Sequence, residues 1–486
     1  MQSIWNLDKN ILSHDSLVTN INADVAIIGA GMCGVLTAYL LNKKGVNVVV
    51  LEANTIGSGQ TQNTTAKITS QHGLIYNNLI NQFGESAAQQ YATANQQAIA
   101  KYATIIRDNN IECDFERLSA YVYTLRDSPL IEDEFAAATK LGIDCEYVTE
   151  TKLPFKIEGA VCFKNQAQFN PLKFIEKIVA PLKIYEHTLV TGIDKNVVIT
   201  SHGKVTAKKI VVTAHYPFLK LPGLYIARLY EQRSYAIALK SAAMIDGMYI
   251  DECSNGYSFR NYRDMLILGG AGHRVGENSE GGCYDDLRKS AKRYYPESQE
   301  VTCWSAQDCM PLDGIPYIGQ YTKSMKDVYI ATGFQKWGMS TSMVAANIIC
   351  DSITGKSNKY KEVFSPQRLN LRASYKNITS NISHSTKGLM RNLTNNPQTK
   401  IDDVPVGHGA IVSIDGEKSG VYKDKNSVLH IVSVTCPHMG CQLEWNPDEL
   451  SWDCPCHGSR FDFDGNLLNG PALKGTKIKH DKKDTQ

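Results

Sequence analysis

Two short motifs rich in cysteine and histidine, near the C-terminus, constrain this chain more than any other feature. Residues 436–441 read CPHMGC and, after twelve further residues, residues 454–459 read CPCHGS. Two cysteines and two histidines on tight loops can hold a metal. Mixed Cys2His2 ligation suits either zinc or a [2Fe–2S] centre in which two histidines bind one iron.

The residues around these ligands distinguish the two metals. Each motif holds a second cysteine, Cys441 or Cys456, together with small residues that let backbone amides approach bridging sulfides. A zinc finger needs neither feature. The flanks therefore favour the iron–sulfur centre.

This segment resembles the Rieske domain of the cytochrome bc1/b6f type, whose third, covering loop reads G-P-A, as residues 470–472 do here. The resemblance implies two thiolates on one iron and two imidazoles on the other, namely Cys436, Cys454, His438 and His457. It also implies a disulfide between Cys441 and Cys456, and a hydrogen bond from Ser459 to the cluster.

Length and composition indicate an ordinary globular protein. A chain of 486 residues suggests two or three domains of roughly 100–200 residues each. A net charge of +2 gives no electrostatic reason to expect nucleic-acid or membrane binding. We see no secretory signal and no apolar run near the roughly 20 residues of a membrane span. We therefore expect a cytoplasmic protein whose cysteines outside the two motifs are small buried side chains.

Another motif, rich in glycine, lies near the N-terminus. A buried strand over 24–28 leads into GAGMCG at 29–34, followed by helical periodicity over 35–42. Another strand over 46–51 stops at Glu52. This order of strand, glycine turn, helix, strand and acid is typical of a dinucleotide-binding unit.

Each fingerprint residue has a physical role in such a unit. Gly29 permits the tight turn, Gly31 lets the backbone approach a pyrophosphate, and Gly34 lets the helix pack on the strand. Glu52 can bind ribose hydroxyls. A similar glycine run within 266–276 lacks a following amphipathic helix, so we interpret it as a strand that enters a turn. A separate NAD(P)H-binding domain is therefore not expected.

The single fingerprint, with a late strand over 328–331 and a glycine turn over 332–341, resembles the D-amino-acid oxidase-like superfamily of FAD-dependent oxidoreductases. The resemblance covers residues 20–360. It implies an α/β fold, in which a Rossmann-like FAD-binding domain is interleaved with a mixed-sheet substrate domain. We expect a linker over 361–395 and a small all-β Rieske domain over 396–486.

The same resemblance implies which residues contact FAD beyond the fingerprint. The loop after Glu52 passes the pyrophosphate, and the late turn contacts the flavin end. The implied contacts are Thr64, Thr65, Ala66, Gly333, Gly338, Met339, Ser340 and Thr341.

Catalytic side chains are harder to assign, because the cofactor supplies most of the chemistry. Four polar residues lie in segments expected near the flavin or the substrate sheet: His72, Arg260, His273 and Lys336. Amino-acid oxidases of the superfamily commonly hold the substrate carboxylate with an arginine where this chain has Gln307 and Asp308. An acid there favours an amine or polyamine-like substrate, although Arg260 or Arg274 could compensate.

Together these features predict an enzyme that oxidises a small amine or amino-acid-like substrate at FAD. The electrons would pass from flavin to the Rieske cluster and on to a one-electron acceptor, for which an acceptor protein is one candidate. Histidine ligation raises the cluster potential to roughly −150 to +300 mV, which makes the cluster a plausible acceptor from reduced flavin. Two alternatives stay open: an oxidase that reduces O2 directly with a structural Rieske module, and a non-catalytic redox carrier or sensor.

Overall fold

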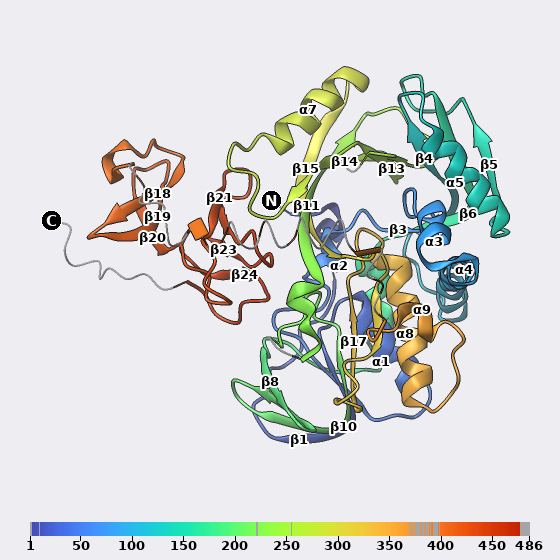
Figure 1. Cartoon of the computed structure of the whole chain (residues 1–486), viewed down its shortest axis with the longest axis horizontal. Coiled ribbons are helices and arrows are strands. Elements are labelled where there is room, and N and C mark those ends of the chain that lie inside the picture. The colour runs from blue at the N-terminus through green and yellow to red at the C-terminus, as the bar shows by residue number, and fades with distance from the viewer. Residues whose placement is uncertain are drawn as a thin grey trace. The chain divides into compact units, whose positions relative to one another are not determined.

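The computed structural model describes residues 2–8, 10–219, 222–253, 255–368, 370, 373–374, 381, 384, 388, 390–391, 397 and 399–476. These divide into two compact units (Figure 1). We define the large unit as residues 1–223, 234–272 and 284–373, and the small unit as residues 224–233, 273–283 and 374–486.

The first sheet of the large unit has a parallel centre. Its strands run in the order β16 (Tyr317–Gln320), β17 (Val328–Thr332), β10 (Lys204–Val212), β1 (Ile21–Ile28), β2 (Val48–Leu51) and β7 (Lys183–Tyr185). All neighbours from β17 to β7 are parallel. Strands β8 (Val190–Asp194) and β9 (Val197–Thr200) extend the sheet from β10. The last four residues of β1 are all buried, as expected for a strand covered on both faces.

The register aligns the carboxyl ends of these parallel strands. Ile28 lies opposite both Leu51 and Val212, and Val212 lies opposite Ile330. The residues that leave the strands therefore emerge at one sheet edge. In open α/β sheets this edge is where ligands bind.

Helices cover this sheet. Helix α1 (Met32–Asn42) packs against α8 (Gly338–Ile353), and α8 packs against α4 (Glu85–Asp108). Among the fully described elements the other α-helices are α2 (Gln60–Asn63), α3 (Tyr76–Phe83), α5 (Pro129–Lys140), α6 (Pro171–Ile178), α7 (Cys283–Tyr294) and α9 (Lys361–Phe364). Within the described ranges, every helix is too short or too polar to cross a membrane.

The second sheet is mixed. Its order is β15 (Gln299–Pro311), β11 (Leu229–Lys240), β14 (Met265–Arg274), β13 (Ser258–Tyr262), β12 (Gly247–Asp251), β4 (Glu116–Thr124), β6 (Gly159–Gln168) and β3 (Lys67–Ile68), with β5 (Cys145–Val148) on β6. Strand β14 contains the whole glycine run of 269–272 and ends only at Arg274. The turn predicted within 266–276 therefore comes at the end of that range.

The small unit contains two antiparallel sheets. One is β18 (Gly409–Ile414), β19 (Glu417–Lys423) and β20 (Leu429–Ser433); the other is β21 (Glu444–Asn446), β22 (Ser451–Asp453), β23 (Arg460–Asp462) and β24 (Leu467–Asn469). Trp452 and Phe461 are completely buried in its core. The predicted fold class, an α/β part followed by a small β domain, is confirmed.

The predicted linker is divided between the units. Val363 and Phe364 are buried, and Arg368 forms an ion pair with Asp313, all within the large unit. The described residues from 374 onward belong to the small unit. The remainder of 361–395 lies outside the described residues.

Candidate functional site

The glycine turn of the large unit leads into the N-terminus of helix α1, where the Met32 N–H donates to the Thr61 hydroxyl at 2.9 Å. Helix α1 begins at N-cap Gly31, which offers no side-chain cap. A Cβ on Gly31 would meet only the Thr61 hydroxyl, at 3.3 Å. A Cβ on Gly34 would instead lie 1.9 Å from the Gly29 carbonyl oxygen. Glycine at 34 therefore lets α1 approach β1, while glycine at 31 keeps the helix N-terminus accessible to phosphate.

Glu52 lies directly beside this turn. Its Oε2 accepts a hydrogen bond from the Ala30 N–H at 2.7 Å, and its Oε1 accepts one from the Asn54 N–H at 2.9 Å. Burial raises the pKa of Glu52. The carboxyl group is thus fixed at the end of β2, in the position that a ribose-binding acid needs.

The loop over 63–66 is held by side chains from distant parts of the large unit. Its first two carbonyls accept hydrogen bonds from the indole N–H groups of Trp304 (2.9 Å) and Trp5 (2.7 Å). The next two accept from Nη1 of Arg260, at 2.6 and 2.9 Å. Four successive carbonyls are therefore fixed before any ligand binds. Sequence reasoning missed Trp5 and Trp304, because nothing local to either residue points to this loop.

Arg260 is a structural residue in this arrangement. Its side chain is 1% exposed, its Nε donates to the Asn261 carbonyl at 3.0 Å, and its guanidinium lies 5.4 Å from the Trp5 ring centre. Burial lowers the pKa of Arg260 to about 9. The predicted catalytic residue thus acts on the loop backbone.

His72 contacts the late glycine turn, one of the predicted flavin segments. Its Nδ1 lies 2.7 Å from the Tyr91 hydroxyl, and its Nε2 lies 2.8 Å from the Thr69 carbonyl and 3.1 Å from the Ser340 hydroxyl. The ring stacks on Trp337 with 4.8 Å between centres. Burial lowers the pKa of His72 to about 3. A neutral, fully engaged imidazole is suited to positioning residues 337–340, more than to proton transfer.

A positive group lies next to the same loop. Lys67 is half-buried, and its Nζ donates to the Thr65 hydroxyl at 3.3 Å. Burial, with the nearby charges of Arg260 and Lys336, lowers the pKa of Lys67 to about 7. Lys336, a predicted catalytic residue, is exposed. Lys67 was not among the predicted site residues, although its place directly after the Thr65-Ala66 pair is a usable signal.

The other predicted residues have partners of their own. His273 lies in the small unit, with Nδ1 2.7 Å from the Arg274 carbonyl. Asp308 accepts a hydrogen bond from the Ser234 hydroxyl at 3.3 Å, and Gln307 is buried. Burial lowers the pKa of His273.

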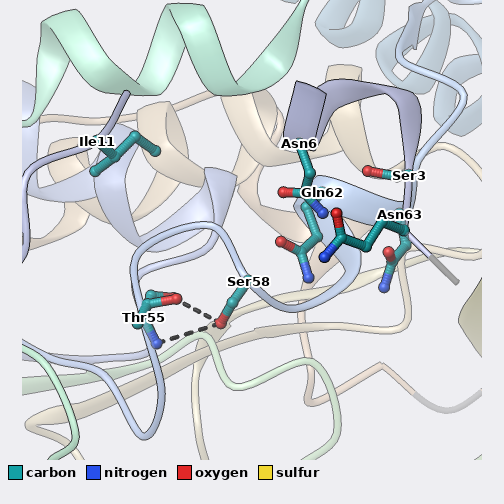
Figure 2. Close-up of a pocket in the computed structure, with 8 residues that line it drawn as sticks. Ser3, Asn6, Ile11, Thr55, Ser58, Gln62 and Asn63 are labelled. Atoms are coloured by element: carbon teal, nitrogen blue, oxygen red, sulfur yellow. Dashed lines mark hydrogen bonds between the residues drawn. The ribbon is translucent and has the colours of Figure 1, made fainter. Parts of the chain in front are cut away.

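A polar cavity of about 590 Å³ lies on the N-terminal segment and the loop before residue 64 (Figure 2). Apart from Ile11, its lining is made of hydroxyl and carboxamide side chains: Gln2, Ser3, Asn6, Thr55, Ser58, Gln62 and Asn63. Ser58 donates to the Thr55 carbonyl at 2.7 Å, which closes the loop on itself. The lining is neutral and offers no charged group for chemistry.

In the small unit, the two predicted cluster loops have the same backbone design. The Gly440 N–H donates to the Cys436 carbonyl at 2.9 Å, and the Gly458 N–H donates to the Cys454 carbonyl at 3.0 Å. Both glycines have positive φ, 80° and 81°, which glycine adopts without strain. The covering loop is tied to the second of these loops through the Ala472 N–H, which donates to the Ser459 hydroxyl at 3.0 Å.

The four predicted ligands lie buried together. The rings of His438 and His457 are 5.0 Å apart. The hydrogen bond from the Cys454 thiol lowers the pKa of Cys436 to about 7, with help from the backbone N–H groups of His438 and Met439. The pKa of Cys454 rises, because its thiol donates this hydrogen bond to Cys436 and is buried. Two adjacent thiols with amide groups directed at sulfur, beside two buried imidazoles, fit a [2Fe–2S] cluster with mixed ligation.

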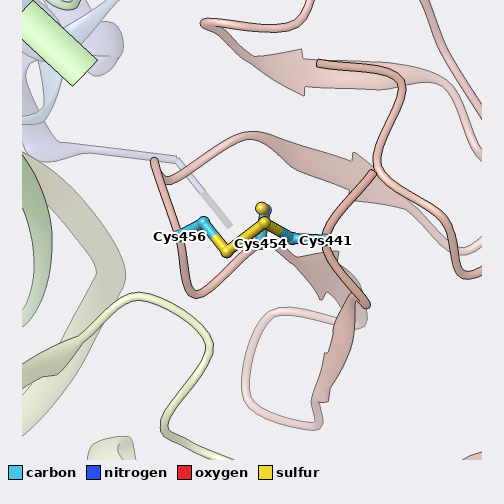
Figure 3. Close-up of side chains that lie close together, drawn as sticks. All are labelled: Cys441, Cys454 and Cys456. Carbon is cyan, nitrogen blue, oxygen red and sulfur yellow. A yellow bond between two sulfur atoms is a disulfide. The ribbon is translucent and has the colours of Figure 1, made fainter. Parts of the chain in front are cut away.

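The structure joins Cys441 and Cys456 by a disulfide, the pairing that the Rieske resemblance implied (Figure 3). Their Cα atoms are 6.6 Å apart. The Cys454 sulfur lies close to both, so the three form a sulfur-rich group. Because the disulfide removes two of these thiols, this trio lacks the thiolates of a metal site. Cys436 and Cys454 with the two histidines therefore stay the predicted ligand set.

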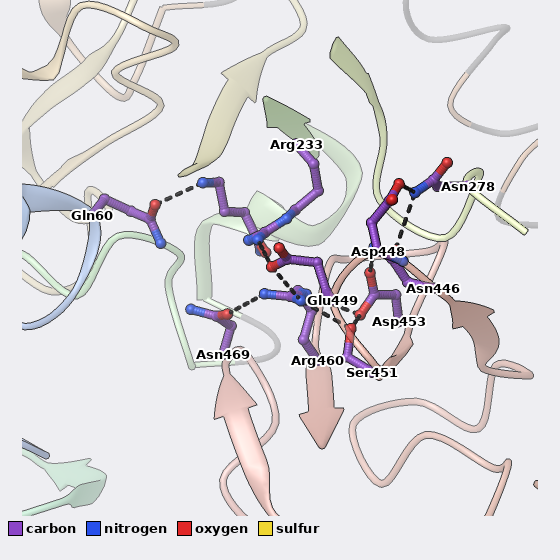
Figure 4. A network of polar contacts seen from close by, with 11 residues as sticks. Gln60, Arg233, Asn278, Asn446, Asp448, Glu449, Ser451, Asp453, Arg460 and Asn469 are labelled. Atoms are coloured by element: carbon purple, nitrogen blue, oxygen red, sulfur yellow. Dashed lines mark hydrogen bonds and ion pairs between the residues drawn. The ribbon is translucent and has the colours of Figure 1, made fainter. Parts of the chain in front are cut away.

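A buried network of alternating charges brackets the second loop (Figure 4). Asp453, directly before Cys454, accepts from Arg460 Nε at 2.9 Å. Arg460 also donates to Glu449 at 3.1 Å, and Glu449 pairs with Arg233. Arg233 comes from the 224–233 segment of the small unit. A residue from the middle of the chain is thus part of the surroundings of the cluster loop.

Comparisons with known proteins agree with this division. The FAD dependent oxidoreductase family model matches residues 24–352, and the Rieske [2Fe-2S] domain model matches residues 395–479. A Bacillus subtilis protein named as a Rieske 2Fe-2S iron-sulfur protein, YhfW, is 36% identical over 493 residues, covering 98% of this chain and 97% of its own length.

Solved structures share the fold of the larger part. Glycine oxidase from Geobacillus kaustophilus has a TM-score of 0.61 and 17% identity, covering 72% of this chain and 99% of its own. L-proline dehydrogenase from P. horikoshii has a TM-score of 0.60 and 16% identity, covering 72% of this chain and 98% of its own.

Proposed function

Because the chain belongs to the FAD dependent oxidoreductase family and carries a Rieske [2Fe–2S] domain, we propose that it oxidises a small amine or amino-acid-like substrate and passes the electrons on singly to an acceptor. Bound FAD supplies two-electron oxidation, and the cluster supplies one-electron transfer. One observation carries the proposal: residues suited to each group are present in one chain. The fusion then converts a two-electron oxidation into single-electron steps.

In this proposal each site is held by residues described above. The FAD contacts are Gly29, Gly31, Gly34, Glu52, Thr64, Thr65, Ala66, Gly333, Gly338, Met339, Ser340 and Thr341. The cluster ligands are Cys436 and Cys454 on one iron and His438 and His457 on the other. The uncrowded Gly31 at the N-terminus of α1 supports the first set, and the buried thiol and imidazole groups support the second.

The charge beside the loop favours a substrate that carries a carboxylate. Lys67, Arg260 and Lys336 are close enough that the two neighbours lower the pKa of Lys67. A positive field attracts an anion and repels a cationic amine. Two proteins of the same fold are named for amino acids, glycine and L-proline. This outweighs the preference for polyamines that Gln307 and Asp308 suggest, so we propose amino-acid-like substrates with Lys67 as the carboxylate-binding residue.

The test uses pairs of compounds that differ only in the carboxylate: glycine with methylamine, N-methylglycine with dimethylamine, and L-proline with pyrrolidine. Under anaerobic conditions, at least one acid should bleach the flavin absorbance of the purified protein faster than its partner. The electron paramagnetic resonance (EPR) signal of the reduced cluster should then appear. In Lys67→Met the KM for the acid should rise about tenfold or more, with a smaller change in kcat. Faster bleaching by the amines would overturn the carboxylate assignment.

The electron acceptor that the protein uses distinguishes this proposal from an oxidase that reduces O2 directly and from a redox carrier. In His457→Ala, substrate should still bleach the flavin, while reduction of a one-electron acceptor should fall to near background. Substrate-dependent peroxide production at an unchanged rate in this variant would identify an oxidase with a structural Rieske module. Failure of every compound in a wide panel to bleach the flavin would favour a redox carrier.

A further inference from the structure

The small unit includes an eleven-residue segment of the sequence that the FAD family matches, residues 273–283. This segment packs against the second cluster loop. A Cβ on Gly276 would lie 2.8 Å from the Cα and the N of Pro455, and Gly276 has a φ of 77°. A side chain at 276 therefore has no room, and the segment lies directly on the backbone beside Cys454.

Hydrogen bonds hold the rest of the segment in place. The Asn278 amide donates to Asn446 at 3.0 Å and to Asp448 at 2.9 Å. The Asp448 carboxylate also accepts from the backbone N–H groups of Gly282 and Cys283, at 3.1 and 3.0 Å. The segment is thus a fixed part of the wall around the second cluster loop.

Arg274 brings a positive charge to this wall. Its guanidinium stacks over the Tyr230 ring at 5.0 Å, and its Nη2 donates to the Asn381 side chain. Tyr230 belongs to the other mid-chain segment of the small unit, 224–233. Arg274 comes two residues before Gly276, which packs on Pro455 in the second cluster loop. The Arg274 charge is also close enough to interact with His457. A positive charge therefore lies beside the proposed cluster ligands.

Reduction of the cluster adds one electron and makes or breaks no bond. A fixed positive charge stabilises the form with the additional negative charge, and the effect is strong where water is excluded. We propose that Arg274 raises the reduction potential of the Rieske cluster. This inference rests on the proposed ligand set. The part of the chain related to flavoenzymes would then set how readily the cluster accepts an electron.

The test is a mediated redox titration of the purified full-length protein, in which an electrode supplies the electron and the EPR signal reports the reduced cluster. In Arg274→Gln the equilibrium constant for reduction should fall about tenfold, which is ~59 mV for a one-electron couple. Arg274→Lys, which keeps the charge, should stay within about threefold of wild type. Lys425→Gln removes an exposed positive charge from a turn of the same unit, and it should change the constant less than about twofold.

Asn381→Asp is a second variant that keeps Arg274 in place. A carboxylate on the Arg274 guanidinium should offset part of its charge and lower the constant by about threefold. Iron and flavin contents equal to wild type confirm that each variant is assembled. Unchanged potentials in both Arg274→Gln and Asn381→Asp would overturn the inference while leaving the cluster assignment intact. A wild-type EPR spectrum without histidine-ligated character would overturn the ligand set, and this inference with it.

Discussion

The loop over 63–66 in the large unit and the two cluster loops in the small unit are held in place by different means. The first depends on Trp5, Trp304 and Arg260, which are distant in sequence. Each cluster loop instead closes on itself, through one glycine N–H and the carbonyl of a cysteine four residues earlier. A loop that is closed by bonds within its own motif can be predicted from sequence. A loop that is held by distant residues also depends on substitutions outside any motif.

The largest effect should come from the crowded glycine of the large unit. In Gly34→Ala the new methyl group would lie 1.9 Å from the Gly29 carbonyl oxygen, so α1 has to move away from β1. We expect loss of FAD and destabilisation by more than about 3 kcal/mol. Flavin content and urea unfolding measure both.

Gly45→Ala is the matched control. Gly45 has a positive φ of 76°, which Gly34 lacks, and its Cβ position is in open space. It should cost only about 1 kcal/mol and retain FAD. Equal losses in the two variants would show that the approach of α1 to β1 adds nothing beyond the cost of a methyl group at an uncrowded site.

A change at the cluster site should remove the cluster and leave FAD bound. His457→Ala removes a proposed iron ligand, so the EPR signal of the reduced cluster should disappear while FAD stays bound. His430→Ala, on β20 of the same unit, removes an imidazole that bonds to Asp464 at 2.7 Å, and it should keep the signal. Retention of a normal signal in His457→Ala would remove His457 from the ligand set.

The sequence made the contiguous parts of both sites predictable. The 29–34 turn, Glu52 and the 436–441 and 454–459 loops are short runs in which spacing alone carries the chemistry. Trp5 and Trp304 could not be found in this way, because their hydrogen bonds join residues 59 and 241 positions apart. The same holds for His273, since only the folded chain shows that 273–283 belongs to the small unit.

The domain boundary illustrates the same limit. Composition suggests a linker and an independent domain from residue 396, and that independence stays a prediction. In the folded chain, Glu449 pairs with Arg233, and Asp448 accepts from Gly282 and Cys283. A fragment that starts at 396 lacks these partners, so we expect it to be less stable than the same residues in the full chain.

One ion pair can test how much the 224–233 segment stabilises the small unit. Arg233 is 3% exposed and pairs with Glu449, which keeps Arg460 as its second partner. Arg233→Met should therefore cost about 2–3 kcal/mol. Urea unfolding followed by the visible circular dichroism of the cluster gives the value.

A pair near the surface of the same unit provides the comparison. Arg391 is 51% exposed and pairs with Glu444 at 3.0 Å. Because solvent screens such a pair, Arg391→Met should cost less than about 1 kcal/mol. Similar costs for the two variants would mean that the Arg233 contact contributes no more than a surface pair, and that the unit does not depend on its mid-chain segment there.

The effect expected at His72 is a dependence of the free energy of unfolding on pH. The pKa of His72 in the folded protein is about 3, whereas an unfolded histidine titrates near 6.5. Between these values the unfolded chain binds a proton that the folded chain does not. The free energy of unfolding therefore falls as the pH falls below 6.5, by about 2 kcal/mol at pH 5.

His72→Gln removes this titration but also loses the contacts to Tyr91 and Thr69. It should be less stable than wild type at pH 7.5, and the gap should shrink by about 2 kcal/mol at pH 5. Tyr91→Phe, which keeps the imidazole, should show no such convergence. If His72 only positions residues 337–340, the pH profile of kcat in His72→Gln should keep the wild-type shape at a lower level. Loss of an ionisation from that profile would instead restore His72 as a residue that transfers a proton.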